Sequence, residues 1–201
     1  MIAPFPIKPL NIVEARIGWP AIVPTVLRQR CSEVDLSSPE AVAALPLIVH
    51  ELFLALYQSV GLGIAAPQLG VTWRLAVIDT GVIHEPALAT QLVLINPEFV
   101  SVSEEQSDKI EGCLSLRGYQ GNVCRPESIT IKNYAIDGES HIIQADGILA
   151  RVIQHEMDHL DGIVYWSPPR CDSPELDEEG GLTRVTRRRT ASIPYLHEQS
   201  S

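Results

Sequence analysis

The segment with the clearest chemical content is Gln154-His155-Glu156-Met157-Asp158-His159, in which two histidines flank a carboxylate. An α-helix turns by about 100° per residue, so side chains four positions apart lie near one another, one turn along. Both imidazoles can therefore bind one metal ion, with the carboxylate of Glu156 beside them. A metal ion lowers the pKa of water towards about 7, and a nearby carboxylate can accept and pass on its proton. His155 and His159 are thus candidate ligands, and Glu156 is a candidate proton-transfer group.

A third protein ligand is expected, because a catalytic metal site uses three and keeps one position open. Cys113 and Cys124 are the candidates nearest the middle of the chain. Gly112 allows close backbone approach beside Cys113, and the N–H of Leu114 just after it could donate to a developing oxyanion. Cys124 has no neighbouring glycine. We therefore assign Cys113 as the ligand and Cys124 to packing.

A glycine-rich segment, GLGIAAPQLG, occupies residues 61–70. It follows a predicted helix rather than a strand and lacks the lysine of phosphate-binding loops, which argues against a nucleotide site. Gln68 carries a neutral amide N–H, a suitable donor to a carbonyl oxygen that gains charge. The alternative for Gln68 is an amide that only braces its loop.

Two helices and several strands must position these groups. Ser38 and Pro39 begin a helix whose apolar positions recur with helical spacing as far as Leu56, and which ends at the glycines of 61–70. Pro46 is expected to interrupt this helix or to start a second one. The second helix spans about 147–160 and carries the two histidines. Its N-cap is Asp146 and its C-terminal stop is Gly162.

Runs rich in Val, Ile and Thr between turn residues predict strands at 74–79, 91–96, 98–103, 128–136, 140–145 and 163–166. Asp137-Gly138 predicts a hairpin with a type I′ turn, because these residues tolerate positive φ angles.

Composition indicates a globular protein without a broad nucleic-acid surface. Of 201 residues, 45% are hydrophobic and 20% charged, and the formal net charge is −10. That acidic balance argues against DNA as a partner. Four cysteines are too few for a disulfide scaffold. The first residues lack the pattern of a secretory signal, and no run of about 20 apolar residues suggests a membrane span. We expect a cytoplasmic protein, with an organellar location as the alternative.

Three segments, in this order, resemble the peptide deformylase family: GLGIAAPQ at 61–68, EGCLS at 111–115 and QHEMDH at 154–159. The resemblance covers roughly residues 24–166. It implies an α+β fold with antiparallel β-sheets packed around a central helix that bears the HExxH motif. It implies removal of the formyl group from the N-terminal formyl-methionine of nascent proteins, with release of formate. The family typically uses one Fe(II) ion, with Zn(II), Ni(II) or Co(II) as substitutes.

The resemblance also implies individual roles. Cys113, His155 and His159 match the metal ligands, Glu156 matches the general base and acid, and Gln68 and the Leu114 N–H match the oxyanion donors. Gly63 matches a backbone contact to the peptide, and Leu62, Ile148 and Val152 match walls of the methionine side-chain pocket. Glu111 and Arg125 match a supporting pair behind the Cys113 loop. This sequence departs from the family's usual hydrophobic-Pro-Gly after Cys-Leu-Ser, because Leu116-Arg117-Gly118 stand there.

We expect a metal-dependent deformylase domain at 1–169, with an irregular N-terminal extension at 1–23, and a charged, flexible tail at 170–201. The basic run from Arg184 to Arg189 in that tail suits contact with ribosomal RNA. A solvated tail without a partner is the alternative. Two other functions stay open at this point. One is an HExxH zinc endopeptidase that uses Glu178 or Glu179 as its third ligand, and the other is a structural zinc site with both Cys113 and Cys124.

Overall fold

The computed structural model describes residues 11–14, 23–81, 90–117 and 120–164, and the backbone of two further strands. Its helices are the short 3-10 segments η1 (Thr25–Arg28) and η2 (Ala66–Leu69) and the α-helices α1 (Pro39–Ser59) and α2 (Gly147–Leu160). Its strands are β1 (Gly63–Ala65), β2 (Leu75–Asp79), β3 (Gln91–Ile95), β4 (Glu98–Val102), β5 (Gln106–Gly112), β6 (Gln120–Pro126), β7 (Ser128–Tyr134), β8 (Ser140–Asp146), β9 (Ser173–Leu176) and β10 (Leu182–Arg187).

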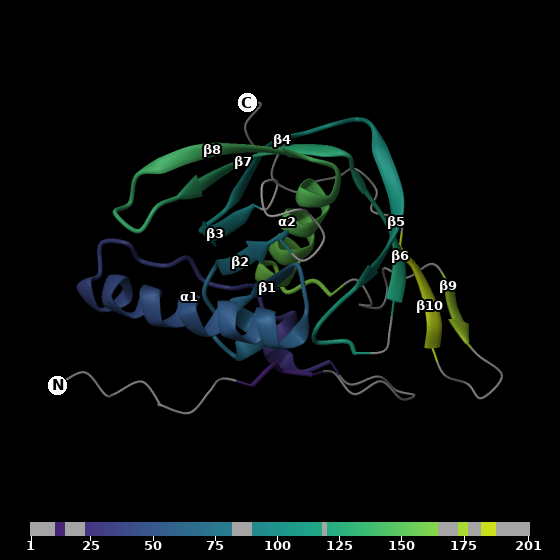
Figure 1. Ribbon diagram of the computed structural model, residues 1–201, viewed down its shortest axis with the longest axis horizontal. Coiled ribbons are helices and arrows are strands. Elements are labelled where there is room, and N and C mark those ends of the chain that lie inside the picture. Colours follow the sequence, from purple (N-terminus) through teal and green to yellow (C-terminus); the bar gives the residue numbers. More distant parts are fainter. Residues whose placement is uncertain are drawn as a thin grey trace.

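The described strands form three sheets around α2. Strands β1, β2 and β3 make one antiparallel sheet and β4, β7 and β8 make another. The third has the order β5-β6-β10-β9, in which only the β6–β10 pair is parallel. Figure 1 shows α2 at the centre, with β7 and β8 above it and the β5–β6 hairpin beside it. The predicted α+β fold with antiparallel sheets is therefore confirmed.

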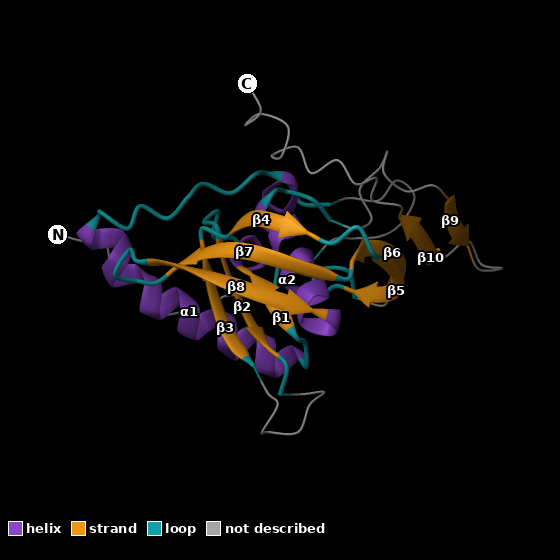
Figure 2. Ribbon diagram, turned by 90° about the horizontal axis from the view of Figure 1, so that it is seen from above, coloured by secondary structure: helices purple, strands orange, loops and turns teal. Residues whose placement is uncertain are grey.

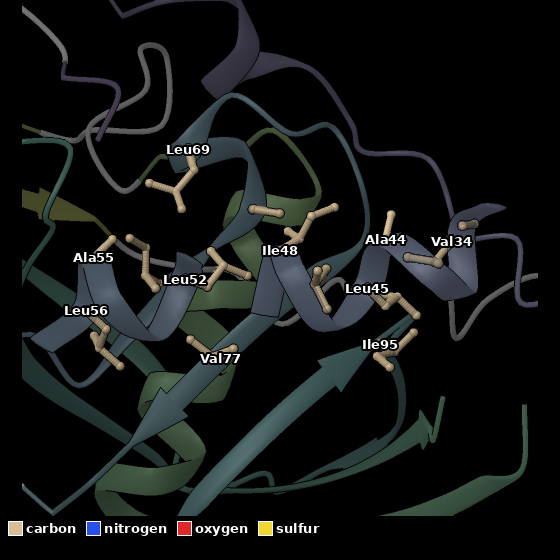
Figure 3. Packing of buried hydrophobic residues seen from close by; sticks show 14 residues of the cluster. Val34, Ala44, Leu45, Ile48, Leu52, Ala55, Leu56, Leu69, Val77 and Ile95 are labelled. Carbon is tan, nitrogen blue, oxygen red and sulfur yellow. The ribbon is translucent and has the colours of Figure 1, made fainter. Parts of the chain in front are cut away.

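Strand β2 separates two apolar clusters. All five of its residues are buried, so its alternating side chains must meet apolar partners on both faces. Leu75 and Val77 pack against α1, and Ala76 and Ile78 pack on the side of α2. Figure 3 shows the first cluster, in which the buried face of α1 lies over the sheet. Figure 2 shows the two helices on opposite sides of β1–β3. Helix α2 therefore packs between two sheets.

Helix α1 runs unbroken through Pro46, so the predicted interruption is wrong. Leu45 and Ile48, on either side of the proline, are both buried in the core, and this packing outweighs the lost hydrogen bond. Ser38 caps the helix as predicted, accepting a hydrogen bond from the Ala41 N–H at 3.2 Å. By length and composition α1 could cross a membrane, yet seven of its residues belong to the buried core. In this fold it is a core helix.

Helix α2 begins and ends where the sequence predicted. Asp146 is its N-cap, although its side chain accepts no capping hydrogen bond, and Gly162 beyond the C-terminus has a φ of 70°. The β7–β8 hairpin is confirmed, but its turn is not type I′. Only Gly138 of the Asp137-Gly138 pair has positive φ, at 85°, and the loop is longer than two residues. That pattern suits a turn followed by a left-handed glycine.

Five of the six strands predicted from the sequence are present. The predictions at 74–79, 91–96, 98–103, 128–136 and 140–145 correspond to β2, β3, β4, β7 and β8. The prediction at 163–166 is wrong for Ile163 and Val164, which lie in irregular backbone after the helix stop, and its other half is outside the described residues. Five strands were not predicted, namely β1, β5, β6, β9 and β10. The domain limits at 169 and 170 and the extension at 1–23 stay predictions.

Candidate active site

The three predicted ligands converge. The ligand atoms of Cys113, His155 and His159 all lie within 4.8 Å of one another. The Cys113 Sγ is 3.2 Å from Nε2 of His159, and the two imidazole rings meet edge to face at 5.0 Å between centroids. Helix α2 supplies both histidines, and Cys113 directly follows β5. Hydrogen bonds from α2 to the β5–β6 hairpin bring Cys113, more than 40 positions away in the sequence, next to the two histidines.

Glu111 orients His155. Nδ1 of His155 lies 2.9 Å from Oε2 of Glu111, and an ionised carboxylate only accepts, so Nδ1 carries the proton and Nε2 is directed to the ligand cluster. Arg125 donates hydrogen bonds to both carboxylate oxygens of Glu111, at 2.6 and 2.8 Å, and one to Asp158 at 2.9 Å. Burial raises the pKa of Glu111, but hydrogen bonds from Arg125 and His155 outweigh it and hold the pKa well below its ordinary value. The predicted Glu111–Arg125 pair is present.

The ligand cluster of Cys113, His155 and His159 suits a bound metal cation. Burial raises the pKa of the Cys113 thiol, but the imidazoles of His159 and His155 lower it to about 5, which favours the thiolate form. Burial lowers the pKa of His155, yet the thiolate and Glu111 raise it well above its usual value. Nδ1 of His159 is buried without a hydrogen-bond partner in the part of the chain that the structure describes. A thiolate and two imidazoles suit a divalent transition metal.

Glu156 lines the same cavity as Cys113 and His155. Its side chain is buried, and its Oε2 has no hydrogen-bond partner among the described residues. Burial raises its pKa to about 7, against the opposing effect of the two imidazoles, so the group can both accept and release a proton near neutrality. Gly63 makes room for it, because a Cβ at residue 63 would lie 2.6 Å from Oε1 of Glu156.

The loop at 61–70 holds Gln68 with its amide nitrogen towards the cluster. The Ala65 N–H donates to Oε1 of Gln68 at 2.8 Å, so the nitrogen is on the other side. That Nε2 donates to Ser115 Oγ at 3.2 Å and lies 3.7 Å from Cys113 Sγ. The backbone N–H of Val13 donates to the Gln68 carbonyl at 2.7 Å, which braces the loop from outside.

A cavity of about 580 Å³ opens beside the cluster. Its lining includes every predicted substrate contact, namely Leu62, Gly63, Ile148 and Val152, together with Gln68, Glu111, Cys113, Leu114, His155 and Glu156. Arg125 and His159 lie behind this surface, buried. An elongated ligand can thus reach Cys113 and Glu156 between the 61–63 segment and the end of β5.

The structure separates the alternatives. Cys124 lies on β6 next to Arg125, and alternation along a strand points these neighbours to opposite faces. Its thiol donates a hydrogen bond to Oε1 of Gln106 at 3.0 Å. Cys124 does not join the ligand group, so the alternative of a zinc site with both cysteines is wrong. Glu178 and Glu179 lie outside the described residues.

Sequence reasoning missed Ser115, Asp158 and Arg151 as members of the site. Ser115 accepts from Gln68, and Asp158 from Arg125. Arg151 donates to Glu111. The available signal was Arg151 itself, because it stands four residues before His155 on a helix that is almost wholly buried, where a cation requires a carboxylate.

Comparisons with known proteins agree with this geometry. A family model described as polypeptide deformylase matches residues 20–170. The peptide deformylase of Natranaerobius thermophilus is 47% identical over 110 residues, which cover 55% of this chain and 67% of the relative. That of Roseiflexus sp. strain RS-1 is 39% identical over 150 residues, which cover 70% of this chain and 79% of the relative.

Solved structures show the same fold. A plant peptide deformylase has a TM-score of 0.67 and 33% identity, over 79% of each chain. The enzyme of Synechococcus elongatus has a TM-score of 0.65 and 34% identity, over 79% of this chain and 78% of that one. Because the matched region spans three quarters of the sequence and every residue of the cluster, this chain belongs to the polypeptide deformylase family of metal-dependent hydrolases, which remove the N-formyl group from nascent peptides.

Proposed function

We propose that Cys113, His155 and His159 hold one divalent ion, and that Glu156 transfers the proton during hydrolysis of the formyl group of formyl-methionyl peptides. The observation that supports this most directly is the convergence of the three ligand atoms within 4.8 Å, beside a buried carboxylate with an unpartnered oxygen. The donor set fits the ion, because one thiolate and two imidazoles suit a divalent transition metal. The Glu111 carboxylate faces the guanidinium groups of Arg125 and Arg151, and the Asp158 carboxylate faces that of Arg125.

The ion, when bound, would acidify water and polarise the formyl carbonyl. Glu156 then takes a proton from the attacking water as the oxygen of that water bonds to the formyl carbon. The amide Nε2 of Gln68 and the Leu114 N–H donate to the oxygen that gains charge. Glu156 delivers its proton to the amide nitrogen as the C–N bond breaks, leaving formate and a free N-terminal amine.

The cavity walls suggest how the substrate is bound. Leu62, Ile148 and Val152 are apolar and lie around the mouth of the ligand cluster, which suits an unbranched thioether side chain. Gly63 has no side chain to obstruct an extended peptide backbone. The Synechococcus elongatus structure holds actinonin, and we infer that the same cavity in this chain binds that compound.

Fe(II) is the proposed native ion, following the family resemblance, with Zn(II), Ni(II) and Co(II) as substitutes that thiolate and imidazole ligands also accept. Protein prepared without oxygen should release formate from a formyl-Met peptide, and metal analysis of the same sample should find one ion per chain. Aerobic preparation should lower both iron content and turnover.

Glu156→Ala tests the central role. The variant should keep its bound ion, since Glu156 is not a ligand, and should lose turnover. Full activity in a folded, ion-loaded Glu156→Ala protein would remove Glu156 from the mechanism. Cys113→Ser should instead lose the ion, whereas Glu178→Ala should keep it. The reverse pair of results would favour the endopeptidase alternative.

Two further proposals concern location and partners. We propose a cytoplasmic location, because nascent formylated chains emerge there, with an organelle as the alternative. Contact with ribosomal RNA through the basic run from Arg184 to Arg189 is tested by pelleting with ribosomes, with and without residues 170–201. Equal pelleting of the two proteins would exclude that contact.

A further inference from the structure

Arg151 connects the catalytic helix to the hairpin that carries the cysteine ligand. Its side chain is buried, and Nη2 donates to the carbonyl and hydroxyl oxygens of Ser107 at 2.7 and 3.0 Å. Nη1 donates to the carbonyl of Val123 at 2.9 Å and to Oε1 of Glu111 at 2.6 Å. These acceptors belong to β5 and β6. One side chain of α2 therefore binds both strands behind Cys113.

The Glu111 carboxylate is held from two directions. Oε1 accepts from Arg125 and from Arg151, both at 2.6 Å, and Oε2 accepts from Arg125 at 2.8 Å and from His155 at 2.9 Å. Arg125 lies on β6 and also donates to Asp158 of α2, so it ties Glu111 directly to that strand and only indirectly to the helix. Arg151 fixes the same carboxylate relative to α2.

Arg151 and His155 stand four residues apart on α2, so they are neighbours on one helix face. Both contact Glu111, one at each oxygen. The carboxylate thus forms a bridge between two side chains of the same helix. Because Nδ1 of His155 bonds to this carboxylate, the position of the carboxylate helps to set the orientation of the imidazole and of its Nε2.

We propose that Arg151 is a positioning residue for the metal centre: it anchors Glu111 from the helix side and through it sets the orientation of His155. The inference rests on the proposed function, and it adds a residue whose effect on the ion is indirect. Outer partners of metal-binding histidines typically alter metal affinity or activity by about 10- to 100-fold. Arg151 also lines the cavity with its stem, next to Ile148 and Val152, so a role confined to the pocket wall must be distinguished.

The test compares Arg151→Met, which keeps an unbranched apolar stem, with Arg151→Lys, which keeps the charge but lacks the fork. Lys109→Met is the matched control, because it removes one positive charge from β5, where Lys109 is half exposed and pairs weakly with Glu127 at 3.8 Å. Ile48→Val in the α1 core is the stability control. Each protein is loaded with Co(II). We measure the rate of ion loss to a chelator, the visible spectrum, kcat and KM for a formyl-Met peptide, and Tm.

Arg151→Met should lose Co(II) about 10- to 100-fold faster, change the visible spectrum and lower kcat, with KM within a few-fold of the parent. Arg151→Lys should be intermediate, and both controls should match the parent in ion loss and kcat. A raised KM with normal ion retention would overturn the inference in favour of a pocket wall. If Ile48→Val loses Co(II) faster in the same proportion to its drop in Tm, the effect reflects general stability and the inference is overturned. An inactive but ion-retaining parent would refute the proposed function and leave the ion-loss comparison valid.

Discussion

Gly63 provides the sharpest test of where Glu156 must lie. A Cβ built on residue 63 would stand 2.6 Å from Oε1 of Glu156 and 2.9 Å from Cγ1 of Val152, whereas ordinary contacts begin near 3.4 Å. In Gly63→Ala the carboxylate would have to withdraw by roughly 0.8 Å. A displacement of about 1 Å of a catalytic group can cost on the order of 10²-fold in rate. Crowding of Val152 adds about 1–3 kcal/mol of destabilisation.

The assay is formate release from a formyl-Met peptide by ion-loaded protein, with kcat and KM determined separately. Displacement of Glu156 predicts a lower kcat with little change in KM, while obstruction of the peptide backbone at residue 63 predicts a higher KM. Ile48→Val in the α1 core is the control, because it lowers stability without changing a residue that lines the cavity. A folded Gly63→Ala enzyme with kcat within two-fold of the parent would refute the close approach of Glu156 to residue 63 during catalysis.

Three further changes test other parts of the structure. Gln68→Ala should lower kcat on the order of 10²-fold with the ion retained, and steady-state kinetics with metal analysis would show whether an oxyanion donor has been lost. Hydrogen bonds from Gln91 and the Gly81 N–H hold the pKa of Asp79 below its usual value, so its contribution to stability is present above about pH 4 and is lost as the pH falls below that. Asp79→Asn should therefore lose less Tm between pH 5 and pH 3 than the parent does. Val60 caps α1 with a φ of 55°, which a β-branched residue adopts at a cost of about 1–2 kcal/mol, so Val60→Gly should raise the free energy of unfolding measured in urea, by about 1 kcal/mol.

The local part of the site was determined by the sequence. The spacing of His155, Glu156 and His159 places them on one helix face whatever surrounds the helix, because helical geometry depends only on the backbone. Caps and stops at Ser38 and Gly162 are local for the same reason. Gly112 beside Cys113 was enough to prefer that cysteine, and the family resemblance added the roles of Gln68 and Glu111.

The tertiary structure decided what depends on pairing. Strand β5 has a single buried side chain, the carboxylate of Glu111, so its sequence carries no hydrophobic alternation to reveal a strand. Only the packing of the β5–β6 hairpin on α2 shows that Cys113 reaches the histidines while Cys124 bonds to Gln106 instead. The continuity of α1 through Pro46 likewise follows from core packing on both sides of the proline. Arg151 gains its meaning only when α2 docks on the hairpin, because a buried guanidinium is defined by acceptors that come from distant strands.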